Sequence, residues 1–233
     1  MNAAKIKMRL KSLANPEDAK GLQWFFKTGP GEYGEGDIFI GVRVPGIRQL
    51  VKEFRNADEL TLLQLLASPI HEERLLALFI LVRQFEAGVP ADRARIYRLY
   101  LAHTDRINNW DLVDLSAPAI VGGYLIARSR RPLFRLVKSK SLWERRIAVL
   151  ATFTFIRNQD FSDALAIADL LLHDAHDLIH KAVGWMLREV GKRELNVLEE
   201  YLAPRCRKMP RTMLRYAIEK FPEAKRRHYL RRA

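Results

Sequence analysis

The segment Arg145-Arg-Ile-Ala-Val-Leu-Ala-Thr152 is apolar enough to form a buried helix. Four other segments share its length and character, and they begin at Arg74, Asn109, His180 and Leu214. In chain order, the second positions of the five segments lie 35, 36, 35 and 34 residues apart. A period of this length indicates tandem structural repeats.

A second helical pattern precedes each apolar segment. These patterns cover roughly residues 57–67, 91–103, 124–138, 161–173 and 194–205. Strong strand alternation appears nowhere, and prolines lie at or near the proposed turns. We therefore expect an all-α protein, an α-solenoid of tandem HEAT-like helical repeats, because a single helix pair cannot bury both of its faces. We expect one domain over residues 1–233, with a basic tail at 223–233.

The charge of the chain is strongly positive. Forty Lys and Arg residues oppose 27 Asp and Glu residues, which gives a net charge of +13. Two basic blocks, residues 124–157 and 201–233, flank an acidic block at 158–200. This pattern predicts a curved basic cleft for a polyanionic partner, with nucleic acid the first choice and an anionic membrane the second.

Several classes of protein are disfavoured. No apolar run approaches the ~20 residues that a membrane-spanning helix needs, and the first nine residues lack the apolar core of a signal peptide. Cys206 is the only cysteine, so an internal disulfide is excluded, which fits a reducing cytosol.

Two local patterns resemble ligand-binding motifs but lack essential residues: a pair of histidines and a glycine-rich segment. His176 and His180 have the spacing of two metal ligands on one helix, but the His-Glu-x-x-His pattern is missing, so we expect no metal. The glycine-rich segment 28–37 lacks the Gly-Lys-Ser/Thr ending of a phosphate-binding loop. We expect it to be a mobile loop that joins two helices near the N-terminus.

Equivalent positions of stacked repeats would form a row along the concave surface. The row consists of Leu75, Trp110, Arg146, Lys181 and Arg215. Its cations could track a phosphate backbone, or they could lie at a solvated helix edge. Asp114 lies one helical turn after Trp110, and Trp185 lies one turn after Lys181. Buried core tryptophans and a solvated aspartate are the alternative interpretation.

Several separated stretches also match a known family in order. They are Phe39-Ile-Gly-Val-Arg-Val-Pro-Gly-Ile-Arg-Gln-Leu50, Trp110-Asp-Leu-Val-Asp114, Leu142-Trp-Glu-Arg-Arg-Ile-Ala-Val-Leu150 and His180-Lys-Ala-Val-Gly-Trp-Met-Leu-Arg-Glu189. On these motifs the chain resembles the AlkD family of bacterial DNA alkylation repair glycosylases. The resemblance runs from the Phe25 region to about residue 222.

The resemblance implies a function and a set of residues. It implies a basic concave face that cradles duplex DNA, and cofactor-independent cleavage of the N-glycosidic bond of cationic N3- and N7-alkylated purines. Trp110, Asp114 and Trp185 would be catalytic, and Arg146 would contact phosphate. Further candidate DNA contacts are Arg145, Lys181, Arg188, Arg43, Arg48 and Phe25, the last of which replaces a tyrosine. A cytoplasmic, nucleoid-associated monomer is expected.

The chemistry of the residues agrees with this reading. An N-alkylated purine is already cationic, so it leaves without protonation, and one carboxylate can stabilise the sugar cation. The two indole faces can pack against that cation. Two alternatives stay open: a non-catalytic helical repeat protein that binds DNA structures or a protein partner, and a basic scaffold for RNA.

Overall fold

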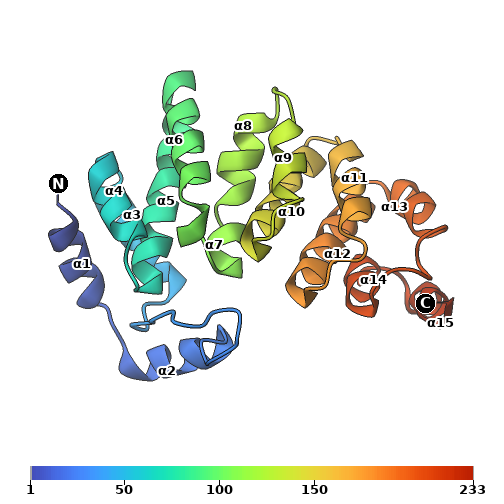
Figure 1. Cartoon of the computed structure of the whole chain (residues 1–233), viewed down its shortest axis with the longest axis horizontal. Helices are drawn as coiled ribbons and strands as arrows, with labels where there is room; N and C mark the ends of the chain where they lie inside the picture. Colours follow the sequence, from blue (N-terminus) through green and yellow to red (C-terminus); the bar gives the residue numbers. More distant parts are fainter. Residues whose placement is uncertain (1, 233) are drawn as a thin grey trace. The chain divides into compact units, whose positions relative to one another are not determined.

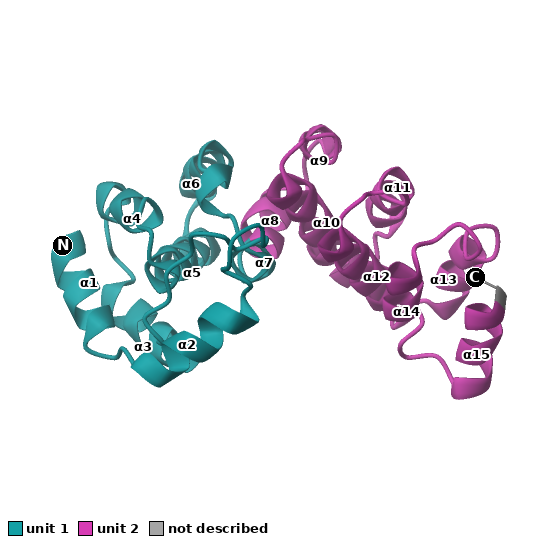
Figure 2. Cartoon of the chain, turned by 60° about the horizontal axis from the view of Figure 1, so that its bottom comes forward, with its two compact units in different colours: residues 1–116 teal, residues 117–233 magenta. Residues whose placement is uncertain are grey.

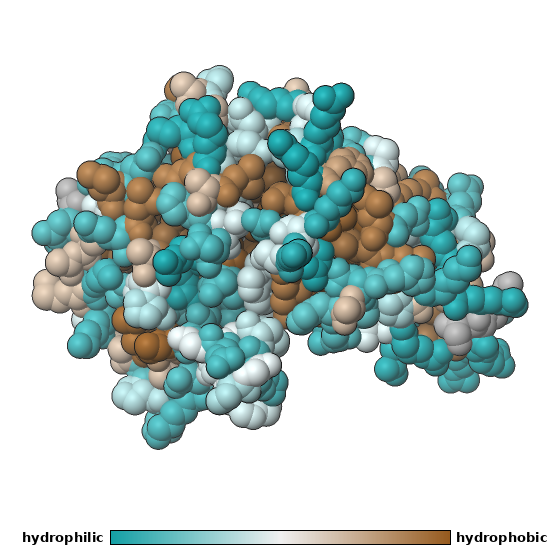
Figure 3. Space-filling view, viewed as in Figure 1, coloured by the Kyte–Doolittle hydropathy of each residue, from teal (hydrophilic) through white to brown (hydrophobic). Residues whose placement is uncertain are grey.

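The computed structural model describes residues 2–232 and shows an all-α protein (Figure 1). Within that range the only extended pairing is an isolated bridge between Ile38 and Ile70. The expected helical class is therefore confirmed. None of the described helices is both long enough and apolar enough to cross a bilayer. On the face shown in Figure 3, hydrophilic side chains cover much of the surface, and apolar side chains are visible among them.

The chain divides into two compact units, residues 1–116 and 117–233 (Figure 2). The helices of the first unit are α1 (Ala3–Lys11), α2 (Pro16–Phe25), α3 (Val44–Phe54), α4 (Glu59–Leu66), α5 (His71–Ala87), α6 (Pro90–Ala102), the short 3-10 helix η1 (Thr104–Arg106) and α7 (Trp110–Asp114). The long apolar helix α5 forms the centre of this unit, because α3, α4, α6 and α7 all pack against it.

The glycine-rich segment lies in the connection from α2 to α3, as predicted, and the residues that follow it are hydrogen-bonded to α5. Glu72 accepts hydrogen bonds from the backbone N–H groups of Ile40, Gly41 and Val42 at 3.1, 2.8 and 3.2 Å. Gly41 has a φ of 83°, and a Cβ there would lie 1.9 Å from the carbonyl oxygen of Asn15. Only glycine therefore fits at position 41, where the chain passes the start of α2.

The second unit contains η2 (Pro118–Gly122, a π-helical turn), α8 (Gly123–Leu125), α9 (Arg131–Leu136), α10 (Leu142–Arg157), α11 (Ser162–Leu170), α12 (Asp177–Gly191), α13 (Leu195–Leu202), α14 (Arg211–Ala217) and α15 (Glu223–Arg232). Helix α12 packs between α10 and α14, while α9 and α11 pack against α10, and α11 and α13 pack against α12. A Cβ on Gly184 would lie 2.5 Å from the carbonyl oxygen of Met213, so α12 and α14 are in close contact at this glycine.

The predicted helices agree with these elements in all but one case. Each of the five apolar segments and each of the five preceding patterns lies wholly or partly in a helix, and four of those five patterns correspond to one helix each. The single helix expected over 124–138 was wrong, because α8 ends at Leu125 and α9 begins at Arg131. Pro132 has no N–H to donate to a preceding turn, so it disfavours an unbroken helix and lies instead in the first turn of α9. The guanidinium of Arg130 donates to the carbonyl oxygens of Leu125 and Ile126 at 3.0 and 2.8 Å.

Both chain ends are helical in the described residues. The N-terminal helix begins at Ala3, and the expected basic tail forms α15 up to Arg232. Met1 and Ala233, which the predicted single domain and tail include, lie outside the described residues.

Candidate functional site

Helix α7 carries Trp110 and Asp114 one turn apart, and both residues are half-buried. Asn109 caps the helix, with its side-chain oxygen accepting the N–H of Trp110 at 2.8 Å. Burial raises the pKa of the neighbouring Tyr100, and the negative charge of Asp114 raises it further, although a hydrogen bond to Ser116 opposes both effects. Asp114 thus acts electrostatically on the core of the first unit.

Two phenylalanines contact the indole of Trp110: Phe25, the last residue of α2, and Phe26, which follows it. Phe26 stacks on Trp110 with ring centroids 4.9 Å apart and an interplanar angle of 13°. Phe25 meets the indole edge-on at 5.8 Å and is 54% exposed. Phe25 and Trp110, both candidates from the sequence, therefore lie together although they are 85 residues apart in the chain.

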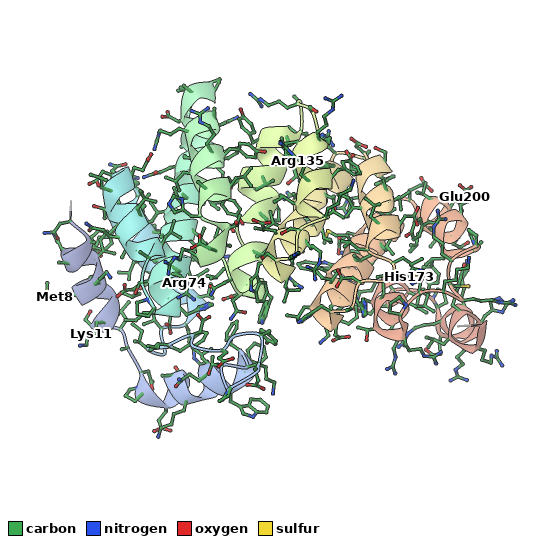
Figure 4. All side chains as sticks on the ribbon, viewed as in Figure 1. Met8, Lys11, Arg74, Arg135, His173 and Glu200 are labelled. Carbon is green, nitrogen blue, oxygen red and sulfur yellow. The ribbon has the colours of Figure 1, made fainter. Side chains whose placement is uncertain are left out.

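A buried cluster of charged and polar side chains lies between the start of α5 and the start of α7. It was not predicted from the sequence. The imidazole of His71 lies between the carboxylates of Asp37 and Asp111, at 3.0 and 2.8 Å. Asp37 also accepts from Asn109 at 3.1 Å and from Arg74, which lies in the first turn of α5 (Figure 4). The signal available in the sequence was the polar run His71-Glu-Glu-Arg74, which opens an otherwise apolar helix.

The cluster shifts the acidity of its members. Burial lowers the pKa of His71, but the carboxylates of Asp111 and Asp37 outweigh burial and raise it to about 9. Burial also disfavours the charged form of Asp37 and so raises its pKa. The hydrogen bond from His71 and the charge of Arg74 outweigh burial and hold this pKa below its usual value. The charged forms of His71 and Asp37 are therefore the favoured forms in the folded protein.

A pocket of about 470 Å³ lies along α3 and α5 of the first unit. Its apolar lining is Val51, Phe79, Val82 and Leu115, and its charged lining is Arg48, Lys52, Arg55, Arg83 and Glu86. The four basic side chains are exposed, and in the described part of the chain none of them is paired with a carboxylate. Leu115 directly follows Asp114, so the pocket adjoins the end of α7. Of its cations, only Arg48 was predicted from the sequence.

Arg43 is bound to a carboxylate at the surface. Its guanidinium donates to both carboxylate oxygens of Asp18, at 3.0 and 2.6 Å, while its side chain remains 75% exposed. This hydrogen bond lowers the pKa of Asp18. The pair links α2 to the start of α3, and much of the guanidinium remains open to solvent.

In the second unit, the predicted residues lie on α10 and α12. Trp185 is half-buried on α12, with its ring 6.1 Å from that of Phe153. Arg146 is only 4% exposed and donates to the carbonyl oxygen of Leu178 at 2.6 Å. Lys181 pairs with Asp177 at 2.8 Å and keeps 40% of its side chain exposed. Two members of the expected row, Leu75 and Arg146, are therefore buried.

Of the other predicted cations of this unit, Arg215 on α14 is exposed and two are engaged in ion pairs. Arg145 binds Asp174 at 2.7 Å, and Arg188 pairs with Glu219. His176 accepts the N–H of Leu178 at 3.2 Å, and His180 contacts the carbonyl oxygen of Asp174 at 2.5 Å. Over residues 2–232, no group of three or more His, Cys, Asp or Glu residues is arranged to hold a metal ion.

Fold and site together define an all-helical protein with an aromatic and carboxylate site on a short helix. A profile of the family described as DNA alkylation repair enzyme matches residues 6–221. The chain belongs to this family, which confirms the resemblance seen in the motifs. A solved structure described as a predicted DNA alkylation repair enzyme from Enterococcus faecalis is similar in fold, with a TM-score of 0.68 and 17% identity over 90% of this chain and 97% of that chain. Among curated proteins, none matches this sequence.

Proposed function

We propose that this protein is a monofunctional DNA glycosylase that hydrolyses the N-glycosidic bond of cationic N3- and N7-alkylated purines in duplex DNA. The observation that carries the proposal is the pairing on α7 of a half-buried tryptophan and a half-buried aspartate one turn apart, in a chain of the DNA alkylation repair enzyme family. A scaffold that only bound DNA would need no such pair.

The chemistry follows from the charge of the substrate. The alkylated purine departs as a neutral base, so the developing positive charge lies on the deoxyribose. In the proposal, the carboxylate of Asp114 stabilises that charge and orients the attacking water. Phe26 stacks on the indole of Trp110 with an angle of 13° between the two rings. The indole offers a π-face to the sugar cation.

The second unit is proposed to supply the rest of the machinery. On the family resemblance, Trp185 provides a second aromatic face, and Arg146 contacts phosphate. Because Arg146 is buried in this structure, we expect its contact to require movement of its side chain. The proposal also includes a solenoid of HEAT-like repeats whose basic cleft holds duplex DNA as a monomer.

The exposed cations of the first unit support a nucleic-acid partner. Residues 1–123 have nearly balanced charge, yet four exposed basic side chains without carboxylate partners gather around one pocket beside α7. Cations without carboxylate partners are well suited to phosphate contacts, because no ion pair must first be broken. We therefore add Lys52, Arg55 and Arg83 to Arg48 as proposed phosphate contacts.

The deciding experiment measures the release of free 3-methyladenine and 7-methylguanine from methylated duplex DNA. The wild-type protein should release them, and Asp114→Asn should slow release by about 10²–10³-fold with little change in DNA affinity. Asp105→Asn is the matched control, because Asp105 is an exposed aspartate of the same unit. It should release both bases at the wild-type rate.

The second candidate function is a non-catalytic DNA-binding protein, and the unpaired cations of the first unit are equally consistent with it. It predicts binding to methylated and unmethylated duplexes without release of any base. Folded wild-type protein that binds DNA and releases neither base would establish this alternative and refute the glycosylase.

A further inference from the structure

The buried histidine of the first unit is in an unusual position, because both of its ring nitrogens face carboxylates. His71 is 1% exposed, with Nδ1 3.0 Å from Asp37 and Nε2 2.8 Å from Asp111. An ionised carboxylate only accepts hydrogen bonds, whereas a neutral imidazole has a single N–H to donate. Two such contacts are satisfied together when both nitrogens carry a proton.

The charges around His71 balance in that state. Asp37 and Asp111 contribute two negative charges, and His71 and Arg74 contribute two positive charges. The other buried carboxylates of α5 are bound elsewhere: Glu72 accepts the backbone N–H groups of residues 40–42, and Glu73 pairs with Lys7 at 2.8 Å. A buried cluster with no net charge avoids the cost of an unpaired buried ion.

The cluster holds the two residues that flank Trp110. Asp111, which follows Trp110, takes a hydrogen bond from His71. Asn109, which precedes Trp110, donates to Asp37, the other partner of His71, at 3.1 Å. The side chains on each side of the tryptophan are thus bound to the same buried cluster.

The rings form a second connection between His71 and Trp110. The imidazole stacks on Phe39 at 4.3 Å, Phe39 on Phe26 at 4.8 Å, and Phe26 on Trp110 at 4.9 Å. Successive rings are inclined by 22°, 21° and 13°. The π-face of Phe39 favours a cation on His71 at the end of the stack. Because the rings pack face to face, the plane of each ring also constrains the plane of the next.

We infer that His71 is a buried imidazolium and a positioning residue for Trp110, which it orients through Asp111 and Asn109 on one side and the stack of Phe39 and Phe26 on the other. The inference rests on the proposed function only in that Trp110 is there a catalytic residue. The charge state of His71 and its hold on Trp110 are properties of the free protein, so they can be tested without DNA.

The first test is the protonation of His71 by nuclear magnetic resonance of ¹⁵N-histidine-labelled protein, with the signal assigned by His71→Gln. Both ring nitrogens should show the shifts of a protonated imidazolium at pH 7 and also at pH 8, where exposed histidines are almost entirely neutral. A neutral tautomer of His71 at pH 7 would overturn the inference.

The second test follows the tryptophan itself. Protein labelled with 5-fluorotryptophan has four fluorine signals, one for each tryptophan, and single Trp→Phe variants assign them. His71→Gln should shift and broaden the Trp110 signal. His103→Gln is the control, because His103 lies in the same unit and its ring hydrogen-bonds to the carbonyl oxygen of Leu99, at 2.8 Å, rather than to a carboxylate. This variant should leave the Trp110 signal in place.

A double variant guards against loss of folding. His71→Gln leaves one excess negative charge in the cluster, whereas His71→Gln with Asp111→Asn leaves none. The double variant should therefore lose less free energy of unfolding than the sum of the losses in the two single variants. Its Trp110 signal should still be displaced. Additive destabilisation, or a wild-type Trp110 signal in the folded double variant, would contradict the inference.

Turnover then separates this inference from the proposed function. If the protein is a glycosylase, the folded double variant should lose at least tenfold in kcat with little change in KM, because Trp110 is misaligned rather than removed. A wild-type protein that releases no base refutes the glycosylase alone and leaves the two resonance tests valid. An active enzyme whose double variant keeps the wild-type kcat would refute the positioning role of His71.

Discussion

At the scale of single residues, the proposed site depends on buried side chains whose charge is set by their partners. His71 and Asp37 are buried and keep their charges because each has the other as a partner. The spacing of Trp110 and Asp114 was readable from the sequence, since residues four apart on a helix share a face. The partners of His71 were not readable, because they lie 34 residues before it and 40 residues after it.

The raised pKa of His71 predicts how stability depends on pH. Folding raises the pKa from 6.5 to about 9, so the stabilisation is complete below pH 6.5 and is lost as the pH rises towards 9 and beyond. The shift corresponds to about 3 kcal/mol. Urea unfolding between pH 6 and pH 10 should show this loss in the wild type and not in the double variant of His71 and Asp111. A pH-independent free energy of unfolding in the wild type would disprove the prediction.

At the scale of elements, the spacing between neighbouring helices depends on small residues at particular positions. Gly184 lets α12 approach α14 so closely that a Cβ would overlap Met213 and Tyr216. The helical period that identified α12 in the sequence does not show that one of its positions needs a glycine, because that requirement comes from the neighbouring helix.

Substitution of this glycine should separate the two helices. Gly184→Ala should lower the free energy of unfolding by roughly 1–3 kcal/mol, because the added methyl group overpacks the contact. Gly21→Ala is the control, since a Cβ at that position in α2 meets nothing within 4 Å. It should be neutral or stabilising by up to about 1 kcal/mol. Equal effects of the two substitutions on urea unfolding would exclude the close contact as the cause.

At the scale of the whole molecule, the excess of basic residues is expected to govern DNA affinity. The net charge of +13 indicates a polyanionic partner but does not say which cations reach it. The structure separates the predicted cations by their partners: Arg145 and Arg188 are in ion pairs and Arg146 is buried, whereas the pocket beside α7 has exposed cations without carboxylate partners.

The salt dependence of DNA binding tests this assignment. The triple variant Lys52→Ala, Arg55→Ala, Arg83→Ala should bind duplex DNA more weakly, and the slope of log K against log salt should fall by about 0.9 for each phosphate that the protein no longer neutralises. The control Lys5→Ala, Lys11→Ala, Arg98→Ala removes the same charge from exposed residues of α1 and α6. An identical slope in both triple variants would show that net charge, and not the pocket, sets the affinity.

The sequence by itself determined the helical class, the positions of most helices, the family and the Trp110–Asp114 pair. Each of these depends on residues close together in the chain or on a period that repeats along it. The tertiary structure decided which cations are buried, paired or exposed, and it assembled the pocket between α3 and α5 and the imidazolium cluster behind α7. These depend on contacts between distant segments, and helical periodicity shows which face of a helix is buried but not which side chain it meets there.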